Sequence, residues 1–310
     1  MRKFLVLSLL LPSVAWADLL PLDEALRATY LSCVGIDEEL SDMKTMAGIN
    51  PAVTAVGTAA AGGATVVGFV KQSTDKDIEE LEKLLEEISK VEDGHPTPTE
   101  QEVNAFMAEF NTSYESAVAG KDNIESEIDR LTEKSKNLGN WRTGLLAGST
   151  ATNVAGAVIA GVNKVDDDLK TQIDNCIASV SELRKSITQA RINGVDVAEA
   201  ETIARECGEY EYVDVSKINK RGKGAMISSA VGAATGLAGT ITSGVANTDK
   251  TRNDNSEAGK AKEKNLNTAA NVLSIGTTAA SATATVFNAT QIKAIKQVAQ
   301  VASKCTGVLK

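Results

Sequence analysis

The sequence predicts an all-α protein, an elongated helical bundle built from a tandem-duplicated helical-hairpin unit whose packing helices are rich in glycine and alanine. Two internal repeats indicate the duplication. In one, matching residues lie 174 positions apart, as Cys33 and Cys207 do, and in the other they lie 128 positions apart, as Gly148 and Gly276 do. A repeated unit that keeps its cysteines and glycines describes a structure rather than a chemistry. A set of long uncharged segments is the third observation behind the prediction.

The N-terminus has the form of a secretory signal peptide over residues 1–17. Arg2 and Lys3 precede an apolar stretch, and residues 15–17 form a small-x-small cleavage site before Asp18. An N-terminal membrane anchor is the alternative, but the apolar stretch is too short to cross a bilayer about 30 Å thick. We therefore expect an extracytoplasmic protein, periplasmic or secreted, after cleavage.

The charge balance disfavours nucleic acid as a partner. The chain carries 41 acidic and 32 basic residues, for a formal net charge of −9, whereas phosphate attraction favours basic proteins. A local exception is the basic group Lys217, Lys220, Arg221 and Lys223. This group could contact an anionic surface, or it could be a solvated segment between two helices.

Four cysteines in an exported chain favour disulfides. Each half of the duplication has one early and one late cysteine, so we predict Cys33–Cys176 and Cys207–Cys305, with Cys176–Cys207 as the alternative pair. A zinc site is disfavoured because His95 is the only histidine and no two cysteines are close in sequence. We expect no metal and no cofactor.

The predicted domains follow the duplication. After the signal peptide, residues 18–191 form a first helical repeat with an inserted helical arm at about 77–136, and residues 192–310 form the second repeat. Within the arm, residues 78–91 form an apolar stripe, residues 94–98 a break, and Thr99 with Glu102 a capping box that begins another helix. In each half, a cysteine-bearing helix precedes two uncharged segments, and a second cysteine-bearing helix closes the unit. The uncharged segments are 52–70, 143–163, 225–247 and 266–289.

Small residues recur every fourth position in these segments, which places them on one slowly winding helix face. Glycine inside a helix costs about 1 kcal/mol relative to alanine, and close approach of two helices is the usual compensation. The expected helix-packing positions are Gly144, Gly148, Gly156, Gly232, Gly236, Gly244 and Gly276. Threonine and valine would also suit strands, but the length of the segments favours helices.

The cysteine-bearing segments are predicted to be amphipathic helices. Residues 165–187 place apolar side chains at alternating spacings of three and four around Cys176, and residues 292–305 do so before Cys305. Between the first cysteine and the first uncharged segment, Gly48 followed by Asn50-Pro51 predicts that one helix ends and another begins.

The sequence lacks the motifs of common catalytic sites. It has no nucleophile elbow, no zinc-protease motif and no phosphate-binding loop, and its carboxylates lie in runs typical of solvated helix faces. We therefore expect a non-enzymatic protein without a small-molecule substrate.

Two functions fit this pattern. The first is an exported helical scaffold or interaction module that binds a protein partner or itself. The second is a membrane-inserting or pore-forming protein, because the four uncharged segments are long enough to span a bilayer. Their glycine spacing resembles the glycine zippers of bacterial envelope and pore-forming proteins, a resemblance that implies membrane contact. Few strongly apolar residues per segment make spontaneous insertion marginal on insertion scales.

Overall fold

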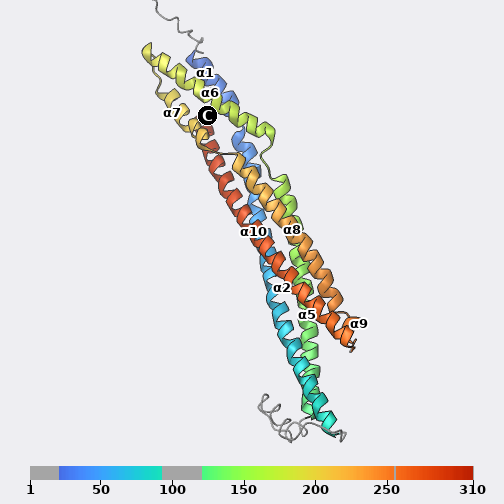
Figure 1. The fold of residues 1–310 in the computed structure, drawn as a ribbon. Coiled ribbons are helices and arrows are strands. Elements are labelled where there is room, and N and C mark those ends of the chain that lie inside the picture. The colour runs from blue at the N-terminus through green and yellow to red at the C-terminus, as the bar shows by residue number, and fades with distance from the viewer. Residues whose placement is uncertain (1–20, 93–120, 255, 310) are drawn as a thin grey trace, which may run out of the picture. The chain divides into compact units, whose positions relative to one another are not determined.

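The computed structural model describes residues 21–92, 121–254 and 256–309. All regular structure in these ranges is helical, and they contain no strand, so the all-α prediction is confirmed and the strand interpretation is wrong (Figure 1). The signal peptide, His95 and the predicted capping box at Thr99 lie outside the described residues. The elements are α1 (Leu22–Cys33), α2 (Ile36–Glu92), α5 (Lys121–Val162), α6 (Asp167–Ile192), α7 (Ala198–Gly208), η1 (Glu209–Tyr212), α8 (Ser216–Ala246), α9 (Asp249–Arg252) and α10 (Glu257–Leu309).

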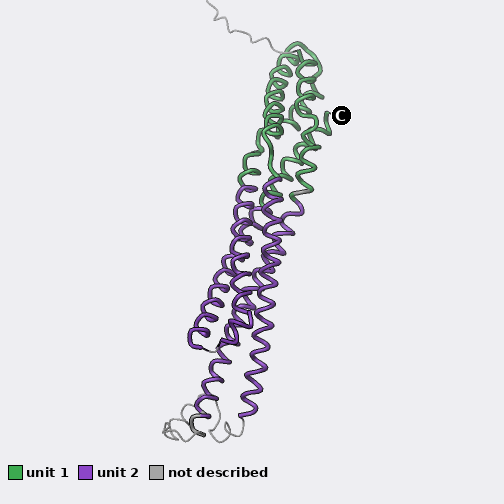
Figure 2. Tube along the Cα trace, turned by 90° about the vertical axis from the view of Figure 1, so that its right-hand side faces the viewer, with its two compact units in different colours: residues 1–47, 163–220, 290–310 green, residues 48–162, 221–289 purple. Residues whose placement is uncertain are grey.

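The chain divides into two compact units, coloured separately in Figure 2. Unit 1 comprises residues 1–47, 163–220 and 290–310, and unit 2 comprises residues 48–162 and 221–289. Each unit therefore draws on both sequence halves. Three helices, α2, α8 and α10, contribute residues to both units.

Unit 1 has a conventional apolar core. The predicted seam is buried along its whole length, from Val165, just before α6, to Leu183 and Ile187 on that helix. Helix α10 contributes Ile295, Val298 and Val301 to the same cluster, and α1 packs against α6. The alternating spacing of three and four found in the sequence is therefore the buried face of both helices, as expected for helices that pack nearly parallel to each other.

Both disulfides lie in this core. Cys33 of α1 is bonded to Cys176 of α6, and Cys207 of α7 is bonded to Cys305 of α10, which is the pairing that the two sequence halves predict. All four cysteines are fully buried. Disulfides of this kind persist in oxidising compartments, so the fold indicates an extracytoplasmic setting.

Unit 2 is a bundle of α2, α5, α8 and α10, in which helices consecutive in the chain run antiparallel (Figure 1). Cross-helix hydrogen bonds fix the register of α2 against α10, because Thr58 meets Thr285 and Thr65 meets Thr278. The four uncharged segments of the sequence lie within these helices, so each is part of a longer helix rather than a helix of its own.

The predicted helix end at Gly48 and restart at Pro51 is wrong, because α2 runs unbroken from Ile36 to Glu92. Proline removes one intrahelical hydrogen bond and usually kinks or ends a helix. Here tertiary contacts hold the chain on both sides of Pro51. Before Pro51, Leu40 is fully buried in the unit 1 core, and after it Thr58 bonds to Thr285 within unit 2. The sequence signal instead coincides with the division between the units, at Ala47 and Gly48.

The described ends of the predicted arm continue the bundle helices. α2 extends to Glu92 and α5 begins at Lys121, and Leu84 and Leu131 are buried along these extensions. A hydrogen bond from Ser135 to Asp75 joins the two helices. The described part of the arm is therefore two extended helices of unit 2, and residues 93–120 lie outside the described ranges.

Candidate functional site

The interior of unit 2 is lined by small and polar residues. On each helix the buried positions recur every three or four residues, which is the spacing of a coiled-coil seam. A water-soluble bundle normally fills such positions with leucine, isoleucine or valine. Along the uncharged segments and their flanks, these positions are Asn50, Thr54, Gly57, Ala61, Ala64, Gly68 and Lys71 on α2; Arg142, Leu146, Ser149, Asn153, Gly156 and Ala160 on α5; Ala225, Ser229, Gly232, Gly236, Gly239, Ser243 and Ala246 on α8; and Asn267, Asn271, Ser274, Thr277, Ser281, Ala284 and Asn288 on α10, where Ala270 is also buried.

The first polar layer, the Asn50 layer, involves all four helices. Asn50 Nδ2 donates to Asn288 Oδ1 at 2.9 Å, and Asn288 Nδ2 donates to Thr54 Oγ1 at 3.3 Å. Gly156 of α5 leaves room for them, because a Cβ there would lie 2.7 Å from Thr54 Cγ2 and 3.3 Å from Ser229 Oγ. Asn50 Oδ1 and Ser229 Oγ have no hydrogen-bond partner among the described residues.

The second layer, the Asn153 layer, repeats this arrangement. Asn153 Nδ2 donates to Ser281 Oγ at 2.8 Å, and Ser149 Oγ donates to the Gly57 carbonyl at 2.9 Å. Gly232 of α8 completes the layer, because a Cβ there would lie 3.0 Å from the Asn153 amide group. A side chain from one helix thus fills the space that a glycine on another leaves open.

The third layer, the Arg142 layer, buries a cation. The guanidinium of Arg142 is fully buried and donates to Ser243 Oγ at 2.9 Å, Asn271 Oδ1 at 3.1 Å and Asn267 Oδ1 at 2.7 Å. All three acceptors are neutral. Gly68 of α2 faces the same layer, because a Cβ there would collide with the Asn271 side chain.

A charged cluster follows the Arg142 layer. Lys71 is buried and pairs with Asp75 at 2.5 Å and with Glu263 at 3.7 Å. Burial raises the pKa of the Glu263 carboxyl, while the Lys71 ammonium opposes this rise. Glu263 therefore keeps its proton to a higher pH than an exposed glutamate does.

Along the uncharged segments, the outer surface of unit 2 carries large apolar side chains. Large hydrophobic side chains are exposed on all four helices, with Trp141 at 68% and Leu237 at 54% exposure. The exposed set is Ile49, Val56, Val66, Phe69 and Val70 on α2; Trp141, Val154, Val158 and Val162 on α5; Ile227, Val231, Leu237, Ile241 and Val245 on α8; and Val272, Ile275 and Val286 on α10. This distribution differs from that in a typical water-soluble domain, where large aliphatic side chains are mostly buried.

Three helical stretches of the described chain could cross a membrane by length and composition: Leu22–Glu87, Lys121–Val162 and Ala198–Ala246. Helix α10 is not among them. Its inward face carries Asn267, Asn271 and Asn288, which lower its mean hydropathy although its outward face is apolar.

The predicted helix-packing glycines fall into two groups. Gly156, Gly232 and Gly236 face side chains of neighbouring helices, with Thr150 Oγ1 2.6 Å from a Cβ at Gly236. A Cβ at Gly276 would meet only Thr235, at 3.9 Å, and one at Gly144, Gly148 or Gly244 would meet nothing within 4 Å, so the predicted close approach does not occur at these three. The reason is geometric, because a four-residue spacing on a 3.6-residue helix drifts by about 40° per step. The α5 stripe therefore turns from the outer surface at Gly144 to the interior at Gly156.

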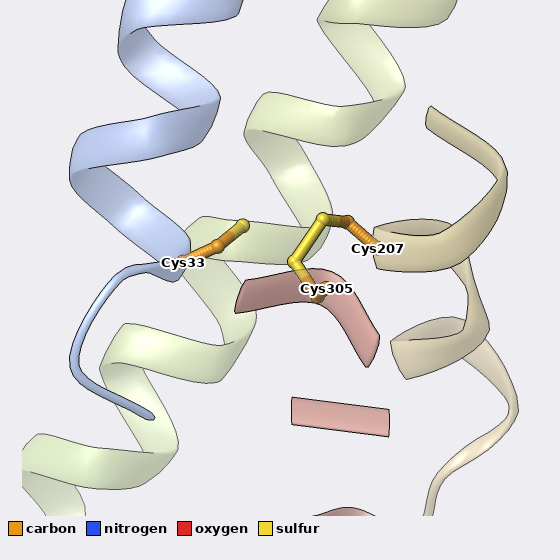
Figure 3. A group of neighbouring side chains, drawn as sticks. All are labelled: Cys33, Cys207 and Cys305. Carbon is orange, nitrogen blue, oxygen red and sulfur yellow. A yellow bond between two sulfur atoms is a disulfide. The ribbon is translucent and has the colours of Figure 1, made fainter. Parts of the chain in front are cut away.

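Cysteines form the one potential metal-binding group found among the described residues. The sulfur atoms of Cys33, Cys207 and Cys305 lie within 4.8 Å of one another. Figure 3 shows these three neighbouring side chains. All three belong to disulfides, and a disulfide sulfur is not the thiolate that zinc requires. In this oxidised form the cluster is two adjacent disulfides that join four helices.

Comparison with protein-family models, with curated proteins and with solved structures finds no match to this chain. Inference about function therefore depends on the geometry of the site.

Proposed function

We propose that the protein is a non-enzymatic, exported envelope protein whose unit 2 resides in a lipid bilayer as a four-helix bundle. The observation that carries the proposal is the reversed distribution of side chains in unit 2, with Asn, Ser, Thr and Arg inside and Val, Ile and Leu outside. Hydrocarbon offers no hydrogen bonds, so a bundle in lipid turns its polar groups inward and its aliphatic groups outward.

The height of the apolar surface matches a bilayer. On α2 the exposed apolar residues run from Ile49 to Val70, and on α5 they run from Trp141 to Val162. At about 1.5 Å per residue, each of these stretches is roughly 30 Å long, which is the thickness of the hydrocarbon core. Trp141 at one end is placed as an aromatic residue at a membrane interface would be.

The positions of the charged residues support the same membrane-spanning stretch, which we call the apolar band. No charged residue occurs in residues 49–70, 224–248 or 265–292, and Arg142 is the only one in residues 141–162. Arg142 is fully buried and hydrogen-bonded. The band therefore presents no charge to lipid.

The hydrogen bonds inside the bundle also explain how segments with few strongly apolar residues could insert into a bilayer. Insertion looked marginal because the Gly, Ser, Thr and Asn residues of each segment offset its few apolar ones. In the bundle those polar residues bond to one another, as Asn153 does to Ser281, and only the outward faces meet lipid. Assembly of the bundle therefore favours insertion.

We further propose that the bundle arose by duplication of one hairpin. A copy displaced by 128 residues makes Asn153 and Ser281 equivalent positions, and these two side chains bond to each other. The pairing of Cys33 with Cys176 and of Cys207 with Cys305 supports the same relation. With the signal peptide removed, the protein would act in the periplasm or outside the cell.

Trp141 offers a site-specific test. It is the only tryptophan beyond the predicted signal peptide, which contains Trp16. Chain beginning at Asp18 is mixed with vesicles containing lipids brominated along their acyl chains, and the vesicles are then floated through a density gradient. We expect the protein to float with the vesicles, to resist extraction by alkaline carbonate, and to show quenched Trp141 fluorescence.

A lysine variant makes the test decisive. A Leu237→Lys substitution in the middle of the apolar surface should reduce membrane association about a hundredfold, since a lysine at mid-bilayer costs about 2.5–3.5 kcal/mol. Tyr212→Lys, at an 85% exposed position in unit 1, is the matched control and should have little effect. A protein that stays soluble, ignores vesicles and self-associates through this surface would refute the membrane proposal and support the helical scaffold.

A further inference from the structure

We propose that the interior of unit 2 is a path for small inorganic anions across the bilayer, and that the Leu146 side chain closes it. This inference depends on the membrane location proposed above. It goes further because a bundle can reside in lipid without conducting anything.

Polar groups line the axis of the bundle over most of its length. The Asn50 layer and the Asn153 layer lie close together, since Asn153 and Gly156 are three residues apart on α5 and so about 4.5 Å apart along its axis. Ser149 extends the line of hydroxyl and amide groups by a further turn. The Arg142 layer and the Lys71 cluster continue it beyond Leu146.

Two polar atoms on this line have unused hydrogen-bonding capacity. Asn50 Oδ1 and Ser229 Oγ are buried, lack a partner among the described residues, and both approach the space at Gly156. Leaving such groups unsatisfied costs about 1–3 kcal/mol each. If these residues served only to hydrogen-bond one helix to another, pairing the two atoms would make the bundle more stable. Water or a hydrated ion on the axis would satisfy both.

The positive charge of Arg142 favours anions over cations in this path. Arg142 is the only charged residue in the apolar band, and its hydrogen bonds go to three neutral oxygen atoms. Asparagine and serine would join the helices without the cost of burying a cation in a membrane. The Asp75 carboxylate also acts on this guanidinium, but Asp75 is paired with Lys71. A buried guanidinium whose hydrogen-bond acceptors are all neutral can attract an anion, and arginine serves this purpose in anion-selective pores.

Leu146 interrupts the polar line. It is fully buried, and it is the only large aliphatic side chain that is buried in residues 141–162. It follows Arg142 by four residues and precedes Ser149 by three, so it separates the two polar stretches. On α8 the facing residue is Gly239, where an added Cβ would lie 3.3 Å from Leu146 Cδ1. The Leu146 side chain packed against Gly239 is a hydrophobic constriction, and such constrictions gate pores by excluding water.

The test measures chloride entry into vesicles that contain a halide-quenched fluorophore, with potassium flux measured in parallel. The wild-type chain should conduct slowly. Leu146→Ser, and Leu146→Ala as a second variant that removes only volume, should increase chloride flux by about tenfold or more by wetting the constriction. Leu31→Ser, at an exposed position of α1 in unit 1, is the matched control and should leave the flux at the wild-type value.

A double variant tests the preference for anions. Arg142→Gln in the Leu146→Ser background should abolish the preference for chloride over potassium while the helical circular-dichroism signal is retained. Equal chloride and potassium fluxes through Leu146→Ser would overturn the anion assignment. Flotation and circular dichroism are recorded for every variant, so that inserted, helical protein with no more flux than empty vesicles would refute the conducting path and leave the membrane location intact. Protein that does not float would refute the location itself.

Discussion

A Gly156→Ala substitution tests the interior of unit 2 most directly. The added methyl group would lie 2.7 Å from Thr54 Cγ2, well inside van der Waals contact. Thr54 cannot rotate away without loss, because its hydroxyl donates to the Asn50 carbonyl at 3.0 Å and accepts from Asn288 at 3.3 Å. The matched control is Gly148→Ala on the same helix, where the new methyl group meets no heavy atom within 4 Å.

The expected energies follow from these contacts. Overpacking costs about 1–3 kcal/mol and a lost hydrogen bond about 0.5–1.5 kcal/mol, while alanine gains about 1 kcal/mol over glycine in a helix. Gly156→Ala should therefore lower the free energy of unfolding by about 1–3 kcal/mol, and Gly148→Ala should raise it by up to about 1 kcal/mol. The two variants should differ by about 2–4 kcal/mol.

Thermal unfolding measures this difference. Both variants and the parent are heated in the same mild detergent while the helical circular-dichroism signal is followed, and the order of midpoints should be Gly148→Ala, parent, Gly156→Ala. A gap of on the order of 5–10 °C corresponds to the expected energies. Equal midpoints for the two variants would show that α5 does not turn Gly156 inward, and the layered interior would be wrong.

Three further outcomes are expected. The raised pKa of Glu263 makes its ionisation unfavourable in the folded state. Glu263→Gln should therefore stabilise unit 2 increasingly as the pH rises above about 4.3, the ordinary glutamate pKa. Thermal unfolding at pH 4.5 and pH 8 measures this effect, and the opposite trend would contradict it. Replacing Cys33 and Cys176 together by alanine should cost about 2–5 kcal/mol in denaturant unfolding, since their disulfide closes a separation of 143 residues, and an unchanged midpoint would contradict that estimate. A double-mutant cycle between Asn153→Ala and Ser281→Ala should show a coupling of about 0.5–1.5 kcal/mol, and additive effects would mean that their hydrogen bond is not made.

The sequence predicted unit 1 better than unit 2, for a physical reason. Apolar side chains at spacings of three and four, as in residues 165–187, identify a buried seam, and the predicted duplication assigned each cysteine the partner that it has in the structure. Polar residues at the same spacing, such as Asn50, Thr54 and Asn153, carry no such signal when buried positions are expected to be apolar. A search for small or polar residues that recur in a seven-residue repeat, with valine and isoleucine at the positions between them, could have found these buried polar positions.

The glycines illustrate the same difficulty. A four-residue spacing gathers Gly144, Gly148 and Gly156 into one stripe, although only Gly156 lies in the interior. The alternating spacing of Arg142, Leu146, Ser149, Asn153 and Gly156 matches the turn of the helix more closely, so it stays on one face. Sequence spacing alone could not separate the two patterns, because it does not reveal which side of α5 meets the other helices.

The change of side-chain type along single helices supports the membrane proposal from a different direction. On α2 the buried positions are Ile36 and Leu40 in unit 1 but Asn50 and Thr54 in unit 2. On α10 they change from Asn288 in unit 2 to Ile295 and Val298 in unit 1.

The two patterns suit two different solvents, as the membrane proposal requires. In water, the burial of apolar side chains drives helices together, and the unit 1 core consists largely of such side chains. In hydrocarbon that force is absent, and close packing with buried hydrogen bonds replaces it, which is what the unit 2 interior provides. A helix whose seam changes from isoleucine to asparagine at the division between two units fits a chain that passes from water into lipid at that point. The basic residues Lys217, Lys220, Arg221 and Lys223 of α8 lie at this division and are suited to contact lipid headgroups.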